Sequence, residues 1–444
     1  MDISVIVLGI LLAAVVIKSI FNIITTLANI LWLGKYKGTV QSPRLASNKK
    51  LFLLLPVYLE QKLIRRVIED YYNLIKDKDN IFLIIITTGK ETDNLANSES
   101  TFNIAKDTID NLRAKNILII HYPHNGGSMP EQLNYAAQEI IKYYGVDNIW
   151  FFTLNIDSKY NERAFGDIIN LVNSKEKIYQ HSAFFLSNFN CFQGWGRLFL
   201  QAAAIFQSRW TITHEIKRYR VNAANIFFSK FQLAHAVGHG LLIPVNIFRK
   251  YCFPVDEIIE DSPFGYLLRC EGHVINPVKN IEIADSPHSF LEHIKQKYTW
   301  SFGPMGYSNY FRKYRNNFSR GYRENRARVL ILTIQGLLSA LNWQVSSWIF
   351  LYLVAGFFYV GNGLALLIVT VLSLYSADYI IAMLYFKKAG YINFSIKSLI
   401  LIYLNLWVVI LIHSLPANCA LLSIVLKWVG LKQNITKFKT EHLK

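Results

Sequence analysis

Charged residues are scarce in this chain of 444 residues, at 17% of the sequence, and acidic residues are fewer than basic ones. A soluble domain carries roughly a quarter of its residues as charged side chains, so the composition disfavours an ordinary water-soluble enzyme. Cysteine is also rare. The four cysteines form no CxxC pair, which excludes a disulfide scaffold and a zinc ribbon.

Phosphate-binding glycine motifs are missing as well. No GxGxxG or GxxxxGK[ST] follows any predicted strand, which argues against a Rossmann dehydrogenase and a P-loop enzyme. Aromatic residues are plentiful, with 29 Phe, 25 Tyr and 9 Trp, and they exclude a disordered chain. The formal net charge of +17 indicates an anionic partner, which could be nucleic acid, a phosphorylated substrate or lipid head groups.

The missing charge is concentrated in two apolar segments. Residues 3–33 contain one charged residue, Lys18, and residues 329–431 contain five. A membrane-spanning helix needs about 20 apolar residues, so residues 1–34 predict one span and residues 329–431 predict about four. The last part, residues 398–431, fits a hairpin of two shorter spans, with a re-entrant segment as the alternative. The expected total is about five spans, give or take one.

Basic residues flank these segments on one side. They occur in residues 35–50, 312–328, 387–388 and 432–444. The positive-inside rule places such flanks in the cytoplasm, with Met1 outside. We therefore expect a multi-pass protein of the plasma (inner) membrane, with a cytoplasmic domain over residues 45–300, an interfacial basic and aromatic segment over 301–328, and a basic cytoplasmic tail over 432–444.

The middle of the chain alternates between strand and helix patterns. Continuous apolar runs predict buried strands at residues 50–58, 80–89, 116–123 and 147–158, and amphipathic stretches predict helices between them at residues 59–75, 99–115 and 129–145. This alternation is typical of an α/β fold with a parallel sheet covered on both faces. Ligands of such sheets bind at the carboxyl ends of the strands.

One strand end carries oxygen ligands. Asn155 and Asp157 follow the apolar run IWFFTL and lie two residues apart. A carboxylate with a second oxygen donor on the same face can hold a hard divalent cation whose shell is completed by substrate phosphates. The alternative is that both residues cap the following loop.

Six motifs in order resemble the family 2 membrane glycosyltransferases, which have a GT-A fold and an inverting mechanism. They are Pro56–Val57–Tyr58–Leu59–Glu60, Gly126–Gly127 followed by Gln132–Leu133–Asn134, Asn155–Ile156–Asp157, Gly238–His239–Gly240, Ile259–Glu260–Asp261, and Gln296–Lys297–Tyr298–Thr299–Trp300. The resemblance covers almost the whole chain. It implies a GT-A domain, inserted between transmembrane helices, that moves a sugar from a nucleotide-diphosphate sugar to a lipid-linked or saccharide acceptor. Membrane lipids are implied as partners, and nucleic acid is not.

The resemblance also assigns roles to residues. Asp261 is implied as the catalytic base, with Glu260 positioning it. Mg²⁺ or Mn²⁺ would be held by Asp157 with Asn155 as a neutral assistant. The nucleotide would contact Pro56, Tyr58, Glu60, Thr88 and Asp157, and the acceptor would contact His239, Gln296 and Trp300. From the residues alone, Glu260 and Asp261 could instead be a helix N-terminal acid pair, because acids are favoured there.

The chain departs from the family pattern in several places. An Asp pair after the second strand is missing, Asn155 replaces the first Asp of the DxD motif, and Thr299 replaces the Arg of the QxxRW motif. Two alternatives therefore stay open beside single transfer. One is a processive polysaccharide synthase, and the other is a catalytically dead GT-A protein with a binding or regulatory role.

Overall fold

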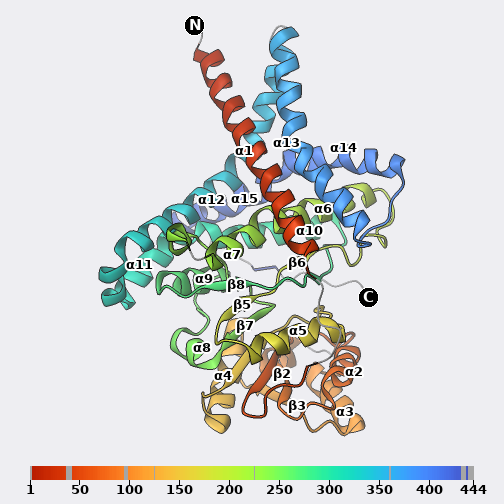
Figure 1. The fold of residues 1–444 in the computed structure, drawn as a ribbon, viewed down its shortest axis with the longest axis vertical. Coiled ribbons are helices and arrows are strands. Elements are labelled where there is room, and N and C mark those ends of the chain that lie inside the picture. Colours follow the sequence, from red (N-terminus) through yellow and green to blue (C-terminus); the bar gives the residue numbers. More distant parts are fainter. Residues whose placement is uncertain are drawn as a thin grey trace.

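The computed structural model describes residues 3–36, 43–94, 99–124, 126–224, 226–359, 362–431 and 437–438. Figure 1 shows an α/β body at one end and long apolar helices at the other, with further helices between them. Most of the expected basic tail, residues 432–444, lies outside the described residues, apart from Lys437 and Phe438.

The α/β body is built on a seven-stranded sheet with the strand order β3-β2-β1-β4-β7-β5-β8. Its strands are β1 (Lys50–Pro56), β2 (Ile81–Thr88), β3 (Ile117–Tyr122), β4 (Ile149–Thr153), β5 (Ile178–Gln180), β7 (Leu241–Pro244) and β8 (Ile275–Pro277). The four strands expected from the sequence are confirmed and pair in parallel, with Leu53 opposite Leu83 and Phe152. Strand β7 is antiparallel to both β4 and β5, so the sheet is mixed.

Helices cover both faces of this sheet, as the apolar strands require. Along β1, Leu51, Leu53 and Leu55 belong to one buried cluster, whereas Phe52 and Leu54 belong to another. This split follows because successive side chains of a strand point to opposite faces. The first cluster includes residues of α2 (Ile64–Ile75), α3 (Thr101–Leu112) and α5 (Glu162–Asn173), and the second includes residues of α4 (Met129–Tyr144), α8 (Val245–Tyr251) and α9 (Asp261–Cys270).

A second body of helices lies between the sheet and the apolar end. It contains α6 (Arg197–Trp210), a π-helical turn (Thr211–Glu215), α7 (Ile216–Ala223), α10 (Phe290–Met305) and α11 (Tyr307–Asn317). Short elements complete it: a 3-10 helix (Phe227–Phe231) and the two-stranded sheet of β6 (Ala183–Phe184) and β9 (Glu282–Ile283). Helix α6 packs in one apolar cluster with α1, α13 and α14, so it links the second body of helices to the apolar end.

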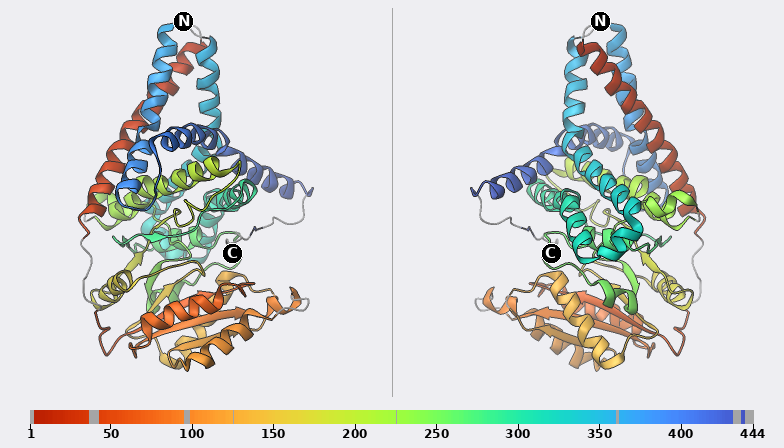
Figure 2. Two further views of the ribbon diagram at one scale, coloured as in Figure 1. Left: turned by 90° about the vertical axis from the view of Figure 1, so that its right-hand side faces the viewer. Right: turned by 90° about the vertical axis from the view of Figure 1, so that its left-hand side faces the viewer.

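Four stretches of the described chain are long and apolar enough to cross a membrane: Ile6–Gly34, Ser319–Phe358, Gly363–Lys388 and Ile396–Trp428. The first three belong to α1 (Ile3–Gly34), α12 (Ser319–Tyr359) and α13 (Asn362–Lys388). Figure 2 shows α1, α13 and the end of α12 converging at the top of the molecule. Their outward side chains include the exposed Ile17, Ile24 and Leu366, which suits contact with lipid better than contact with water.

The expected hairpin in residues 398–431 is not what the structure has. Helices α14 (Ile396–Ile412) and α15 (Ser414–Trp428) follow one another with only His413 between them. They run across the base of the upright helices in both views (Figures 1 and 2). Pro416 does not form a turn between two spans but lies in the first turn of α15, where proline is tolerated because the amide it lacks would have no partner inside the helix.

Candidate active site

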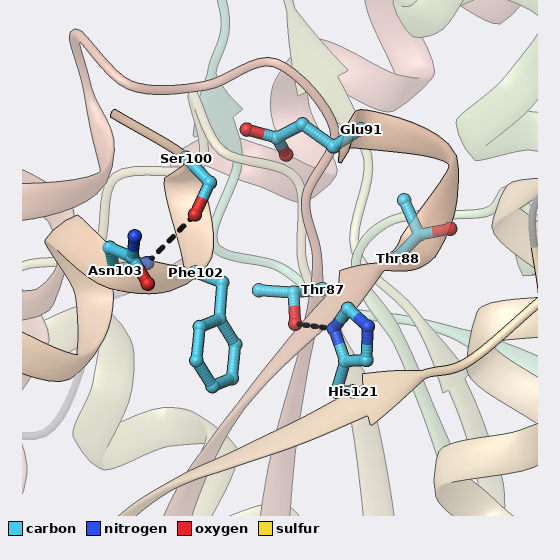
Figure 3. Close-up of a pocket in the computed structure, with 7 residues that line it drawn as sticks. All are labelled: Thr87, Thr88, Glu91, Ser100, Phe102, Asn103 and His121. Carbon is cyan, nitrogen blue, oxygen red and sulfur yellow. Dashed lines mark hydrogen bonds between the residues drawn. The ribbon is translucent and has the colours of Figure 1, made fainter. Parts of the chain in front are cut away.

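The carboxyl ends of β2 and β3 border a cavity of about 370 Å³ (Figure 3). Its lining consists of Thr87 and Thr88 at the end of β2, His121 in β3, Glu91 in the 3-10 helix Gly89–Asn94, and Ser100, Phe102 and Asn103 at the start of α3. The Thr87 Oγ1 and His121 Nδ1 atoms are 2.9 Å apart. The cavity therefore combines an aromatic ring with several hydrogen-bonding groups, and among the nucleotide-contact residues expected from the sequence it includes Thr88.

The loop that follows β1 is attached to the rim of this cavity by Glu91. One Glu91 oxygen accepts hydrogen bonds from the Thr101 N–H at 2.7 Å and from Gln61 Nε2 at 2.9 Å. The N–H of Glu60 donates to Thr101 Oγ1 at 3.0 Å, and Lys90 Nζ lies 5.2 Å from the centre of the Tyr58 ring. Pro56, Tyr58 and Glu60 thus lie next to the cavity on a fixed loop. Sequence reasoning missed Glu91, because a lone Glu in a polar turn has no pattern of its own.

The glycine pair expected near the nucleotide lies over the same strand end. A Cβ placed on Gly127 would come within 2.8 Å of Thr88 Oγ1 and 2.7 Å of the Tyr122 ring. Only glycine lets the chain pass this close. Farther along, the Asn134 side chain exchanges two hydrogen bonds with the backbone of Phe253, at 2.8 and 3.0 Å, and so holds the segment that leads to Glu260.

The turn after β4 presents Asn155 and Asp157. It is closed by two hydrogen bonds of 3.1 Å, from the Asn155 N–H to Ser158 Oγ and from the Ser158 N–H to the Asn155 carbonyl. Tyr71 fixes the turn from behind by donating to the Ser158 carbonyl at 3.2 Å. Asn155 and Asp157 are both half-buried, so their oxygens lie at the edge of the site.

Whether this turn suits a divalent cation depends on its donors. In the described ranges, no group of three or more His, Cys, Asp or Glu side chains is placed to hold a metal ion. One carboxylate and one amide oxygen are hard ligands that fit Mg²⁺ or Mn²⁺, which commonly bind through one or two carboxylates when substrate phosphates supply the other positions. The donor set therefore fits a cation shared with a diphosphate.

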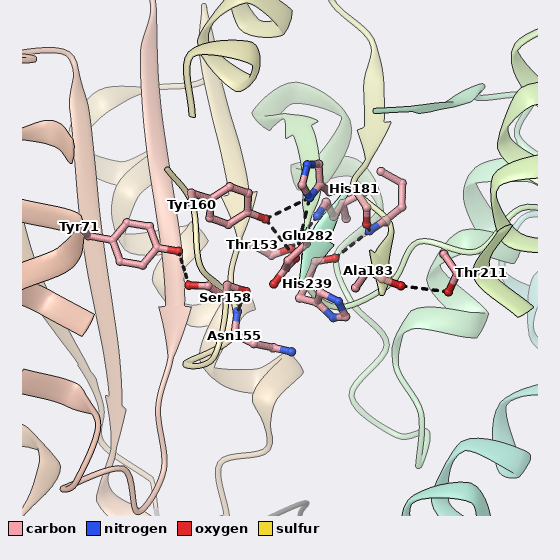
Figure 4. Close-up of polar contacts among 12 residues, drawn as sticks. Tyr71, Thr153, Asn155, Ser158, Tyr160, His181, Ala183, Thr211, His239 and Glu282 are labelled. Carbon is pink, nitrogen blue, oxygen red and sulfur yellow. Dashed lines mark hydrogen bonds and ion pairs between the residues drawn. The ribbon is translucent and has the colours of Figure 1, made fainter. Parts of the chain in front are cut away.

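A buried polar network lies beside this turn (Figure 4). Tyr160 donates to Glu282 Oε2 at 3.2 Å, and His181 Nδ1 lies 3.9 Å from the same oxygen. Burial acts to raise the pKa of Glu282, but the His181 hydrogen bond and the charges of His239 and His181 outweigh it and lower the pKa to about 2. Glu282 therefore stays ionised. Sequence reasoning missed this network, because its members are far apart in the chain.

His239 lies on a turn whose backbone is fixed by two hydrogen bonds. Gln180 Nε2 donates to the His239 carbonyl at 2.7 Å, and the Gly240 N–H donates to the Thr153 carbonyl at 2.8 Å. Gly240 has a φ of +67°, in the region that favours glycine. The His239 side chain is half-buried, and Figure 4 shows it beside Glu282 and Asn155.

Glu260 and Asp261 stand at the beginning of α9. Glu260 is at the N-cap position, yet within the described chain its side chain makes no capping hydrogen bond. Burial and the neighbouring Glu260 raise the pKa of Asp261 to about 7, against the opposing effects of Lys437, the Ser262 backbone and His239. This is the behaviour expected of a general base that works near neutral pH, whereas a simple helix cap would keep a low pKa.

Two close approaches bring this carboxylate pair to its place. A Cβ on Gly265 would lie 2.5 Å from the Ala236 nitrogen, so α9 rests directly on the segment that leads to Gly238. A Cβ on Gly303 would lie 2.5 Å from Ser262 Oγ, so α10 touches the first turn of α9.

Helix α10 carries the acceptor residues expected from the sequence. Trp300 is half-buried, with its ring 5.8 Å from Phe185 and 4.2 Å from Lys297 Nζ. Gln296, one turn earlier, is 8% exposed. Burial lowers the pKa of Lys297 to about 7. Trp300 and Thr299 are thus on the helix that borders Asp261, while Gln296 is largely enclosed.

Comparisons with known proteins find only distant structural neighbours. No family model matches the chain, and no curated protein matches its sequence. Among solved structures, the mannosyltransferase PcManGT from Pyrobaculum calidifontis in complex with GDP-Man and Mn²⁺ is 12% identical, with a TM-score of 0.48 over 90% of this chain and 99% of that one. The crystal structure of S. aureus TarS 1-349 is 11% identical, with a TM-score of 0.36 over 78% and 94%. Both TM-scores are below 0.5, so neither similarity supports a functional conclusion about this chain.

Proposed function

We propose that this protein is a membrane-bound, inverting glycosyltransferase of family 2 with a GT-A domain. It would move a sugar from a nucleotide-diphosphate sugar to a lipid-linked or saccharide acceptor at the cytoplasmic face of the membrane. The observation that carries the proposal is the carboxylate pair Glu260–Asp261. It is a like-charge pair in which a Glu260 oxygen approaches the turn of Gly238 and His239, and the His239 side chain lies beside Asn155 (Figure 4).

The chemistry follows from these positions. Asp261 would take the proton of the acceptor hydroxyl while the acceptor oxygen bonds to the anomeric carbon. The bond between that carbon and the diphosphate oxygen breaks, and the nucleoside diphosphate leaves. A divalent cation bound at Asp157 and Asn155 would neutralise charge on the departing diphosphate. Attack from the side opposite the leaving group inverts the anomeric centre.

The nucleoside would occupy the cavity at the ends of β2 and β3. Phe102 offers a ring for stacking on a base, and Thr88, Asn103 and His121 offer hydrogen-bonding groups. Pro56, Tyr58 and Glu60 would close its near side. On the acceptor side, we propose that His239 and Trp300 contact the acceptor and that the enclosed Gln296 positions α10.

The apolar helices indicate how the protein would lie in the membrane. Helices α1, α12 and α13 have outward apolar surfaces, and α14 and α15 lie across their base. We propose that α1, α12 and α13 span the bilayer, that α14 and α15 lie in its cytoplasmic interface, and that the basic residues of 301–328 contact lipid head groups. In a variant lacking its native cysteines, a cysteine at position 98 should resist an impermeant thiol reagent in intact cells. Labelling there would contradict this orientation.

The test of the function is direct. Detergent-solubilised full-length protein should release nucleoside diphosphate from at least one nucleotide sugar, GDP-mannose among those tried, in the presence of Mg²⁺ or Mn²⁺. An acceptor extract should then gain labelled sugar. If a broad set of donors gives no release above that of an Asp157→Ala/Asp261→Asn double variant, the chain is a dead GT-A protein and the proposal fails. Long labelled products would instead show a processive synthase.

A further inference from the structure

The last two residues that the structure describes lie against the carboxylate pair. Lys437 Nζ is 2.9 Å from Glu260 Oε2. The Lys437 side chain is 47% exposed and that of Glu260 is 10% exposed, so the ammonium reaches the carboxylate from the open side. A residue near the end of the chain thus contacts the site that we propose for catalysis.

The neighbouring Phe438 attaches this segment to α10. Its N–H donates to Thr299 Oγ1 at 3.3 Å, and its ring centre lies 5.6 Å from that of Tyr298. Lys295 Nζ is 5.8 Å from the same ring. Lys437 and Phe438 together therefore connect α10 to the first residues of α9. The contact at Thr299 is notable because this threonine stands where the resembled motif has a basic residue.

We propose that Lys437 is a positioning residue of the active site, whose ammonium pairs with Glu260 and thereby keeps Asp261 available as the proton acceptor. The role rests on the function proposed above. Two adjacent carboxylates resist ionising together, and a cation on one of them lowers the cost of charging the other. Lys437 would supply the positive charge that Thr299 does not.

The titratable groups around Asp261 show what the Lys437 ammonium contributes to its ionisation. The titratable groups that act on it, or on which it acts, are Glu260 on α9, Lys437, His239 on the turn before β7, Tyr219 on α7, and Tyr307 and Tyr310 on α11. Among them Lys437 and His239 favour the ionised form of Asp261, whereas burial and Glu260 oppose it. Removing the ammonium should therefore raise the pKa of Asp261.

The experiment compares the transfer rate of full-length variants as a function of pH. Lys437→Gln should reduce transfer at pH 7 by about fivefold, because raising the pKa of Asp261 by about one unit from about 7 lowers its ionised fraction from about a half to about a tenth. It should also move the acidic limb of the profile to higher pH. Lys437→Arg should restore most of the rate, because it keeps the charge. Lys427→Ala, at an exposed lysine on α15, serves as the matched control and should behave like the wild type.

A second measurement does not depend on activity. A carbodiimide joins an amine to a carboxylate only when they are in contact, so the wild type should yield a 437–260 cross-linked peptide by mass spectrometry, and Lys437→Gln should not. Absence of that peptide, an unchanged pH profile in Lys437→Gln, or a faster Lys437→Gln variant, as expected of a tail that blocks the site, would each overturn the proposal. A wild type that forms the cross-link but transfers no sugar would instead overturn the proposed function.

Discussion

Two regions of the molecule bury charged groups, and they do so in opposite ways. At the start of α9, Glu260 and Asp261 place two like charges side by side at the border of the site, where Asp261 remains partly exposed. Between α6 and α13, Arg209 and Asp378 place opposite charges 2.7 Å apart, with side chains only 4% and 1% exposed. Arg209 Nη2 also donates a hydrogen bond to the Tyr379 hydroxyl oxygen at 2.6 Å.

The difference distinguishes an ion pair that stabilises the fold from a carboxylate pair that could take part in a reaction. The Arg209–Asp378 pair is matched in charge and almost fully enclosed, so it joins α6 to α13 and is closed to a ligand. The Glu260–Asp261 pair consists of like charges, and burial and repulsion raise the pKa of Asp261 to about 7, so that this carboxyl can take up or release a proton near neutral pH. Buried like charges at an accessible edge are costly to maintain, and such groups cluster at functional sites.

The largest effect should come from the Asn155–Asp157 turn, which we propose to hold the cation. Asp157→Ala removes the only carboxylate of the Asn155–Asp157 pair, and with it several kcal/mol of charge stabilisation in the transition state. Transfer should fall at least about a thousandfold, with the thermal unfolding temperature little changed. Titration of Mn²⁺ into the EDTA-treated wild type should restore its activity but not that of the variant. Full activity in EDTA would contradict a metal role.

The membrane-side pair should respond in stability rather than in catalysis. Asp378→Ala leaves the Arg209 guanidinium buried without its counter-ion, a change that typically costs about 3–5 kcal/mol. The unfolding temperature in detergent should drop clearly. Arg66→Ala, which breaks the exposed Arg66–Asp70 pair of α2 at 3.7 Å, is the control and should have little effect. Equal effects of the two variants would show that burial does not distinguish the pairs.

A smaller effect is expected from the contact between α9 and Ala236, which positions the Glu260–Asp261 pair. Gly265→Ala forces a methyl group to within 2.5 Å of the Ala236 nitrogen, and such overpacking typically costs about 1–3 kcal/mol. Because Ala236 leads to the His239 turn, the variant should also lose transfer activity. Gly196→Ala, where a Cβ meets no atom within 4 Å, is the control. Wild-type stability in Gly265→Ala would show that α9 can shift freely.

Much of the sheet could be predicted because its signals are local. The apolar runs at 50–58 and 80–89 indicate buried strands without reference to any partner, and β1 and β2 fall within them. The beginning of α9 at Asp261 was also predictable, because acids and a proline in the sequence DSPFGYLL mark a helix start.

The rest depended on contacts between distant residues. Glu282 and Tyr160 are 122 positions apart, and Lys437 and Glu260 are 177 apart, so no spacing in the sequence could join them. The course of α14 and α15 also escaped prediction. Hydropathy reports that a helix prefers an apolar environment, but the packing of α14 against α6 determines its direction.

The Asp261→Asn variant decides whether Asp261 is a base or a helix cap. Wild-type transfer should rise with pH through about 7, because only the ionised Asp261 can accept the proton and its pKa is near that value. The variant should fold and bind donor, lose that pH limb, and transfer roughly 10² to 10⁴ times more slowly. Loss of a cap would cost only about 1 kcal/mol of stability. A variant that keeps more than about a tenth of wild-type transfer, outside the range for a lost base, would contradict the account.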